Sequence, residues 1–513
     1  MTIAEPTRVR SGRAARRAER AITSTNGAVP YIVRNIPTYD VLSEENLQRI
    51  EQAADRILAE TGIDFRDDDE AITLWKKAGA QVNGVNVRFE PGMLREILKT
   101  APSEFTQHAR NPANSVQVGG KNVIFAPSYG SPFVMDMDRG RRFGTIEDFV
   151  NFVKLGQSSP WLHHSGGTIC EPTDVAVNKR HLDMVYSHIK YSDRGFLGSV
   201  TAPERAVDCI DMARIVFGND FVDQNCVIMG NFNVNSPLVW DGTMTNGMRE
   251  YAKAGQAVVL VPFILGGAMG PVTSAGAIAQ ALAETMAGCA LVQLERPGAP
   301  VVFGNFLSSM SLRSGSPTFG TPEPAIGSMV IGQLARRLGL PLRCAGNFTN
   351  SKLPDAQAMM EGTMSMLSAV QCGGNFILHS AGFLDGLLSM SYEKFVLDTD
   401  LCGAMHAYLR GVVVDDNTLA VDAFAEVGPG NHFFGCQHTL ANYETAFWDS
   451  DLSDNEPFEK WDANGRTDSA TRANALWKKR LAEYQAPALD PGIDEALLEF
   501  MTKRKASMAD QWY

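Results

Sequence analysis

The chain has 513 residues and carries 46 lysine and arginine against 58 aspartate and glutamate side chains, for a formal net charge of −12. Hydrophobic residues make up 44% and charged residues 20%, which excludes wholesale disorder, collagen and coiled coil. The acidic balance argues against a general binder of nucleic acid or membrane surfaces, because such proteins present a net basic face. A net acidic charge is compatible with a small cationic substrate.

The first 35 residues carry an unusual density of arginine. No apolar segment follows, so a secretory signal is excluded. Glu5 and Glu19 count against a transit peptide, and we predict a disordered tail over residues 1–35. The arginines are Arg8, Arg10, Arg13, Arg16, Arg17 and Arg20.

Residues 36–115 show a helical pattern. Ser43 precedes two glutamates and then apolar residues at helical spacing, as at the start of a capped amphipathic helix. We found no strand alternation here, and we predict a helical N-terminal lobe.

Residues 116–415 alternate short apolar runs with longer amphipathic stretches. This is the rhythm of parallel strands and helices, and eight repeats predict a closed (β/α)₈ TIM-type barrel. A doubly wound open sheet is the alternative, but no GxGxxG follows the first run. The runs are 123–126, 166–170, 195–200, 226–232, 257–265, 300–307, 341–346 and 375–380. The helical stretches are 145–155, 178–190, 204–217, 242–254, 275–294, 323–338, 355–370 and one near Ser391. From about 416 the rhythm stops, and residues 416–513 are predicted to form a C-terminal extension packed on the barrel.

A Gly-Asn-Phe tripeptide recurs at the ends of predicted strands four, six and seven. Catalytic residues of such barrels lie at the carboxyl ends of the strands, so three copies could direct amides and rings into one mouth. The alternative is that the asparagines cap turns and the rings fill the core. The copies give the candidates Asn231 and Phe232, Asn305 and Phe306, and Asn347 and Phe348; a fourth copy, at 374–376, begins strand eight.

His379 ends predicted strand eight and is the main histidine candidate. A neutral imidazole there could donate a hydrogen bond to a substrate, or it could be a satisfied core histidine. His163 and His164 are adjacent, so they would point to opposite faces of a strand and chelate poorly. Glu171 follows predicted strand two and is a further candidate for substrate contact.

The sequence does not favour hydrolase, nucleotide or metal chemistry. It contains no HExxH, GxSxG or P-loop GK[ST]. His432, Cys436 and His438 lie close together but lack a matching fourth ligand, so we expect no metal in this chain. Lys352 follows strand seven and could form a Schiff base, but its neighbours are polar, which gives no sign of the desolvation that lowers a lysine pKa.

Four longer segments resemble the trimethylamine methyltransferase family, and the likeness runs from about residue 40 to 510. The resemblance implies a (β/α)₈ barrel and methyl transfer from a methylated amine to a corrinoid. The segments are 266–276 (GGAMGPVTSAG), 315–325 (GSPTFGTPEPA), 351–357 (SKLPDAQ) and 391–398 (SYEKFVLD).

One difference from the trimethylamine enzymes of the family narrows the range of expected substrates. The trimethylamine enzymes carry pyrrolysine near the end of strand seven, whereas residues 343–350 here (RCAGNFTN) are all standard. This resembles the non-pyrrolysine branch, which acts on quaternary amines such as glycine betaine. A quaternary ammonium already has a neutral amine as its leaving group, so the protein mainly supplies positioning.

For such a reaction, the positions of the candidate residues and the chemistry of a betaine suggest the following roles. His379 and Asn347 are the catalytic candidates, and Arg313, in the loop after strand six, is the candidate partner for a betaine carboxylate. The cobalamin is expected on a separate corrinoid protein, with none held tightly by this chain.

Further expectations concern the cell and the assembly. Eight cysteines without a CxxC pair are typical of reduced thiols, and the apolar run 257–270 is too short to span a bilayer. We therefore predict a cytoplasmic protein that does not bind membranes. With 21 methionines available for an interface, we expect a homo-oligomer.

Two other functions stay open. One is a barrel lyase or aldolase that uses Lys352, and the other is a non-catalytic betaine-binding protein on the same scaffold.

Overall fold

The computed structural model describes residues 29–512, so most of the predicted arginine-rich tail lies outside the described residues. Its last part, residues 29–35, was expected to be disordered and is not. Strand β1 (Ile32–Val33) pairs antiparallel with β7 (Asn122–Phe125), with Ile32 opposite Val123. The backbone N–H of Asn35 donates to Leu409 O at 2.8 Å. The chain therefore enters the fold at the first barrel strand.

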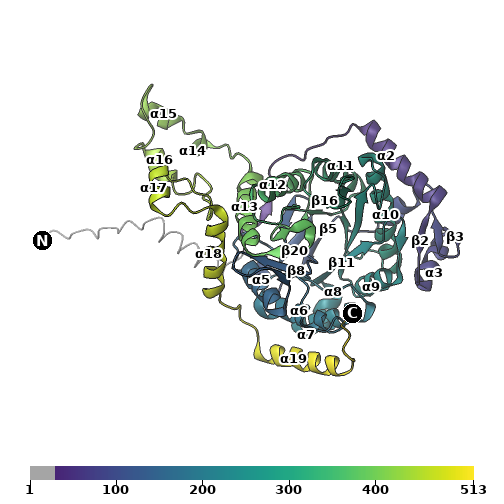
Figure 1. The fold of residues 1–513 in the computed structure, drawn as a ribbon. Coiled ribbons are helices and arrows are strands. Elements are labelled where there is room, and N and C mark those ends of the chain that lie inside the picture. Colours follow the sequence, from purple (N-terminus) through teal and green to yellow (C-terminus); the bar gives the residue numbers. More distant parts are fainter. Residues whose placement is uncertain (1–28, 513) are drawn as a thin grey trace.

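Seven parallel strands form most of a barrel (Figure 1). In spatial order they run from β10 through β18 to β7, and β18 pairs parallel with β7, so the sheet curls on itself. The strands are β7, β10 (Phe196–Leu197), β11 (Ile228–Val234), β13 (Ala257–Gly266), β14 (Val301–Gly304), β17 (Leu342–Ala345) and β18 (Phe376–Leu378).

The eighth position, between β7 and β10, is filled by residues 163–166. His163 N donates to Phe125 O at 3.0 Å, and Ser165 N donates to Gly195 O at 2.8 Å. These bonds close the ring, and the prediction of a (β/α)₈ barrel is confirmed. The second strand was expected at 166–170, which is wrong by a few residues: Gly166 has φ of 96° and turns the chain out of the sheet.

All eight predicted barrel helices are present and surround the strands (Figure 1). Their starts show why they form where they do: α5 begins with a capping box between Thr145 and Asp148, and Asp241 and Asp355 cap α9 and α12. The helices are α5 (Ile146–Ser158), α6 (Arg180–Tyr191), α7 (Pro203–Phe217), α9 (Gly242–Lys253), α10 (Ser274–Glu295), α11 (Pro322–Leu338), α12 (Ala356–Gln371) and α13 (Tyr392–Arg410).

Helix α10 is the most apolar of these. By length and composition it could cross a membrane, but 89% of its most apolar stretch is buried within the fold. It packs between β13 and the N-terminal helices α2 (Glu44–Arg56) and α4 (Met93–Leu98). It is therefore a core helix that joins the barrel to the N-terminal lobe.

The packing of α10 leads to a stability prediction. A Cβ added to Gly288 would lie 2.4 Å from Trp240 Cζ2, and the indole is fully buried. We expect Gly288→Ala to lower the free energy of unfolding by about 1–3 kcal/mol through overpacking. Urea unfolding measures this. The control is Gly435→Ala, where a Cβ meets nothing within 4 Å and the effect should stay within about 0.5 kcal/mol; equal losses at both positions would contradict the prediction.

The N-terminal lobe is not purely helical. Besides α2, α3 (Asp69–Ala78) and α4 it contains strands β2 (Ile63–Phe65), β3 (Gln81–Asn83), β4 (Asn86–Arg88) and β5 (Glu104–Gln107). β2, β3 and β4 form a small sheet with β12 (Val239–Trp240), which follows barrel strand β11. Strands of three residues show too little alternation to be seen in a sequence, which is why the expectation failed.

Short strands and loops cover the carboxyl ends of the barrel strands. β15 (Phe306–Met310) and β16 (Pro317–Thr318) follow β14. β19 (Phe383–Leu384) and β20 (Ser389–Ser391) follow β18 and join a sheet with β8 (Phe133–Asp136) and β9 (Gly140–Phe143). These segments carry several of the site residues described below.

The C-terminal extension has two parts. Helix α18 (Ser469–Ala482) packs on α13 and α5, and α19 (Pro491–Ala506) packs on α6 and α7. Helices α14 (Asp416–Leu419), α15 (Val421–Val427), α16 (Gln437–Asn442) and α17 (Phe458–Ala463) instead project beside the barrel (Figure 1). They were expected to pack on the barrel, but apolar side chains in this part of the chain are exposed to solvent; Phe434, for example, is 86% exposed.

Candidate active site

Five aromatic side chains meet at the carboxyl end of the barrel strands. Phe306 lies 4.9 Å from Phe348 and 5.4 Å from His379 between ring centroids, and Phe383 lies 4.9 Å from Phe348. Phe319 lies 5.4 Å from Phe348. All five are buried. We call Phe306, Phe319, Phe348, His379 and Phe383 the aromatic cluster; they follow β14, β16, β17 and β18.

His379 is held in one orientation within this cluster. It directly follows β18 and has φ of 60°, an uncommon conformation for a residue other than glycine. Its Nδ1 lies 3.0 Å from Ser128 Oγ, and its ring makes an edge contact with Phe383 at 5.6 Å. Burial, and to a lesser degree the charge of Arg343, hold the pKa of His379 well below 6.5. The imidazole is therefore neutral at pH 7.

Arg343 lies inside the barrel beside the cluster. Its neighbours Leu342 and Cys344 pack on the helix layer, whereas Ala345 faces the interior, so alternation directs Arg343 inward. Its Nη1 donates to Asn305 O at 2.7 Å, and its guanidinium carbon lies 5.3 Å from the Phe306 ring centroid. Burial lowers the pKa of Arg343 to about 9. We missed this residue, although a charged side chain within an apolar strand run was a visible signal.

The three Gly-Asn-Phe copies do not act alike. Phe306 and Phe348 belong to the cluster, but Phe232 packs outward against Tyr251 at 5.6 Å and does not reach the mouth. Asn231, its neighbour on β11, faces inward and is buried with no hydrogen-bond partner for Oδ1 among the described residues. Adjacent strand residues point to opposite faces, so both could not face inward.

The other two asparagines support loops. Asn305 Nδ2 donates to Ser328 Oγ on α11 at 2.8 Å, and its Oδ1 accepts from Leu307 N at 3.2 Å. Asn347 is fully buried, and its Nδ2 donates to Ser380 O at 2.6 Å. Asn347 thereby joins the segment after β17 to the segment after β18. Its Oδ1 is buried and has no hydrogen-bond partner among the described residues, and its catalytic role stays a prediction. The turn-capping alternative describes Asn305, whose Oδ1 bonds two residues along the chain.

The charged candidates lie apart from the cluster's rings. Glu171 is paired with Arg180, whose Nη2 lies 2.6 Å from Oε2, and burial raises the pKa of Glu171. Arg313 is exposed in the loop before β16 and has no hydrogen bond or ion pair among the described residues. Lys352 is 69% exposed on its side chain and donates to Asn350 O at 2.6 Å, so it lacks the desolvation that a Schiff-base lysine needs.

A buried ion pair supports the cluster from behind. Lys394 Nζ lies 2.5 Å from Asp398 Oδ1, and both side chains are fully buried in α13. Asp398 Oδ2 accepts from Gly382 N at 2.9 Å, and Gly382 immediately precedes Phe383. Burial raises the pKa of Asp398 to about 6. The pair fixes the chain that runs from His379 to Phe383.

Within residues 29–512 no group of three or more histidine, cysteine or acidic side chains could hold a metal ion. His163 and His164 are engaged in hydrogen bonds with Phe125 N and Gln107 Oε1. His438 Nε2 lies 2.7 Å from Asn417 O.

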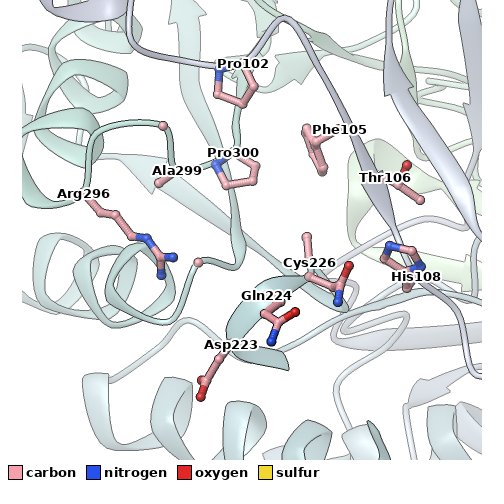
Figure 2. Close-up of a pocket in the computed structure, with 13 residues that line it drawn as sticks. Pro102, Phe105, Thr106, His108, Asp223, Gln224, Cys226, Arg296, Ala299 and Pro300 are labelled. Carbon is pink, nitrogen blue, oxygen red and sulfur yellow. The ribbon is translucent and has the colours of Figure 1, made fainter. Parts of the chain in front are cut away.

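A cavity of about 350 Å³ lies at the opposite end of the barrel (Figure 2). Cys226 and Pro300, which line it, lie two residues and one residue before the parallel strands β11 and β14. Its charged groups are already engaged: Asp223 pairs with Arg214, and Arg296 donates to Lys253 O. Barrel enzymes place their chemistry at the other end, so we assign no site there.

Comparison with known proteins decides the family. The family model described as trimethylamine methyltransferase (MTTB) matches residues 9–509. The chain belongs to the trimethylamine methyltransferase family. A relative named glycine betaine methyltransferase, from Desulfitobacterium hafniense (strain Y51), is 39% identical over 93% of this chain and 99% of its own length.

Two further relatives of the trimethylamine methyltransferase family are more distant. The proline betaine:corrinoid methyltransferase of Eubacterium limosum is 27% identical over 87% of this chain and 94% of its own. Trimethylamine methyltransferase MttB1 of Methanosarcina mazei is 28% identical over 88% and 93%. The solved monomethylamine methyltransferase of Methanosarcina barkeri aligns with a TM-score of 0.46 at 10% identity, over 92% of this chain and 98% of that one. The resemblance inferred from the four segments is confirmed, and the protein is a methyltransferase.

Proposed function

We propose that the protein transfers a methyl group from a quaternary amine of the glycine betaine kind to the cob(I)alamin of a separate corrinoid protein. The observation that carries the proposal is the aromatic cluster at the barrel mouth, in a chain 39% identical to a glycine betaine methyltransferase. Ring faces attract a quaternary ammonium and leave its methyl groups uncoordinated.

The chemistry asks little of the protein beyond positioning. The methyl carbon is attacked in line by Co(I), the C–N bond breaks, and its electron pair stays on nitrogen as a neutral tertiary amine. Cobalt is thereby oxidised from Co(I) to Co(III) in the methylated acceptor. The positive charge leaves nitrogen in the transition state, so neutral rings and a neutral imidazole suit the site better than a fixed carboxylate. His379, with Nδ1 bonded to Ser128 Oγ, places a neutral ring beside the trimethylammonium group of the substrate.

The reaction is tested with the purified protein, a corrinoid protein in the cob(I)alamin state and a panel of methylated amines. We expect the spectrum of methylcobalamin with glycine betaine or a related quaternary amine, and none with trimethylamine. Binding of glycine betaine without transfer would select the binding-protein alternative. Turnover that depended on Lys352 would select the lyase, which the exposed position of that lysine does not favour.

The low pKa of His379 leads to a prediction for the pH dependence of kcat/KM. The substrate does not titrate, and a group with its pKa well below 6.5 stays neutral as the pH falls through that value. We therefore expect kcat/KM to stay level between about pH 7 and 8, above the pKa of about 6 of Asp398, and His379 itself to contribute a fall only at a more acidic midpoint. A pH–rate profile measures this. A midpoint near 6.5 that disappears in His379→Gln would contradict it.

We also propose a cytoplasmic location and a homo-oligomer. All eight cysteines are free and buried, as in a reducing compartment. Light scattering during size-exclusion chromatography tests the oligomer.

A further inference from the structure

Arg343 is an unusual residue for the inside of a barrel. It is 1% exposed, and its single hydrogen bond among the described residues goes to a backbone carbonyl, that of Asn305. No aspartate or glutamate of residues 29–512 forms an ion pair with it, and its Nε has no acceptor there. A positive charge is therefore enclosed in the fold without a negative partner.

Such an arrangement is costly for the folded protein alone. Buried charges are normally paired, because desolvation of an unpaired ion costs several kcal/mol. Burial lowers the pKa of Arg343, yet at about 9 the guanidinium is still protonated at pH 7. The barrel interior thus holds a positive charge for which residues 29–512 supply no anion.

The position of Arg343 relates that anion to the aromatic cluster. Its guanidinium carbon lies 5.3 Å from the centroid of Phe306, and Phe306 in turn contacts Phe348 and His379. Arg343 lies within β17, whereas Phe348 follows the end of that strand. Arg343 therefore extends from within its strand, and its guanidinium reaches the carbonyl of Asn305 beside Phe306, whereas the other rings come from segments that follow the strands.

A quaternary amine alone would be a poor ligand here, because its charge would lie next to an unpaired guanidinium of the same sign. Glycine betaine carries a carboxylate one carbon away from its ammonium. It can therefore pair with the guanidinium and place its ammonium against the aromatic cluster. An arginine fork is also well shaped to hold a carboxylate through two hydrogen bonds.

We propose that Arg343 binds the carboxylate of the substrate while the aromatic cluster holds its trimethylammonium group, so that the site selects zwitterionic betaines over quaternary amines without an acid group. The inference rests on the proposed function. It orients the donor with the carboxylate inside the barrel and the methyl groups toward the carboxyl ends of the strands, where an acceptor protein can approach. It also moves the carboxylate role from Arg313 to Arg343.

The test compares two donors and three variants of the full chain. Dissociation constants of glycine betaine and of tetramethylammonium, which lacks an acid group, are measured by calorimetry for the wild type, Arg343→Met, Arg343→Lys and the control Arg313→Met. We expect Arg343→Met to weaken glycine betaine binding by about 10- to 100-fold and tetramethylammonium binding not at all. Arg343→Lys should lie between, and Arg313→Met should change neither ligand appreciably.

Three results would overturn the inference. They are an equal loss for both ligands, a betaine-selective loss in Arg313→Met instead, and wild-type binding of the two ligands with equal affinity. If Arg343→Met fails to fold, the methyl ester of glycine betaine replaces it: neutralising the carboxylate should weaken binding to the wild type by a similar factor. Absence of methyl transfer by a wild type that binds betaine through Arg343 would refute the proposed function and leave this inference standing.

Discussion

Replacing Lys394 by methionine is expected to lower the free energy of unfolding by about 3–5 kcal/mol. The substitution leaves the carboxylate of Asp398 buried without its cation, bonded only to the N–H of Gly382. Urea unfolding at pH 8 measures the loss. The double variant Lys394→Met/Asp398→Leu should recover most of it, because it removes both charges.

The pH dependence distinguishes lost charge pairing from lost packing. The pKa of Asp398 is already raised to about 6, and removing the lysine raises it further. The carboxyl group of the variant therefore takes up a proton as the pH falls, and the loss caused by Lys394→Met should be smaller at about pH 5 than at pH 8. The exposed pair of Lys503 with Glu499 is the control, and Lys503→Met should cost no more than about 0.5 kcal/mol. A loss that did not change with pH would contradict the prediction.

The second large effect concerns the rings. We expect the double variant Phe306→Leu/Phe348→Leu to reduce kcat/KM for a quaternary amine by about 10²- to 10³-fold, because each desolvated ring face contributes about 2 kcal/mol to binding of a cation. Leucine keeps most of the apolar volume, so the loss reports the ring faces. Methyl-transfer kinetics measure it.

The matched control is Phe232→Leu. It makes the same change in the same tripeptide, but the ring packs outward on Tyr251, so only stability should fall. A carbon analogue of the donor gives a second readout: 3,3-dimethylbutyrate has the shape of glycine betaine without the positive charge. It should bind the wild type more weakly than glycine betaine and lose less affinity in the double variant. Equal binding of the two by the wild type would refute a cation–ring contact.

Much of the barrel could be predicted, because parallel strands covered on both faces are continuous apolar runs. The second strand failed for a physical reason. Residues 163–166 (HHSG) fill that position with polar side chains that bond to neighbouring strands, as when His163 Nδ1 accepts from Phe125 N. A hydrophobicity pattern does not predict a buried strand whose polar side chains form hydrogen bonds inside the protein.

The site was less accessible to such reading. Phe319 and Phe383 come from loops, and only the tertiary fold brings them to Phe348. The repeated tripeptide pointed to Phe306 and Phe348 but also to Phe232, because a motif does not state which of two adjacent residues faces inward. The sequence does show Arg343 as the one charged residue in its apolar strand run. It does not show that no acidic side chain pairs with Arg343 in the fold, and the significance of the residue depends on that.

The aromatic cluster and Arg343 all come from residues 306–383, which contain barrel strands β17 and β18 and the loops that follow β14, β17 and β18. The other half of the barrel, from β7 to β13, contributes Ser128, which bonds to His379, and Phe263 of β13, whose ring centroid lies 5.0 Å from that of Phe306. Most of the residues that we propose to set donor preference therefore lie in one continuous piece of chain. Exchange of residues 306–383 between relatives, as one block, should therefore change most of the proposed donor contacts at once, while the recipient keeps its own residues at positions 128 and 263.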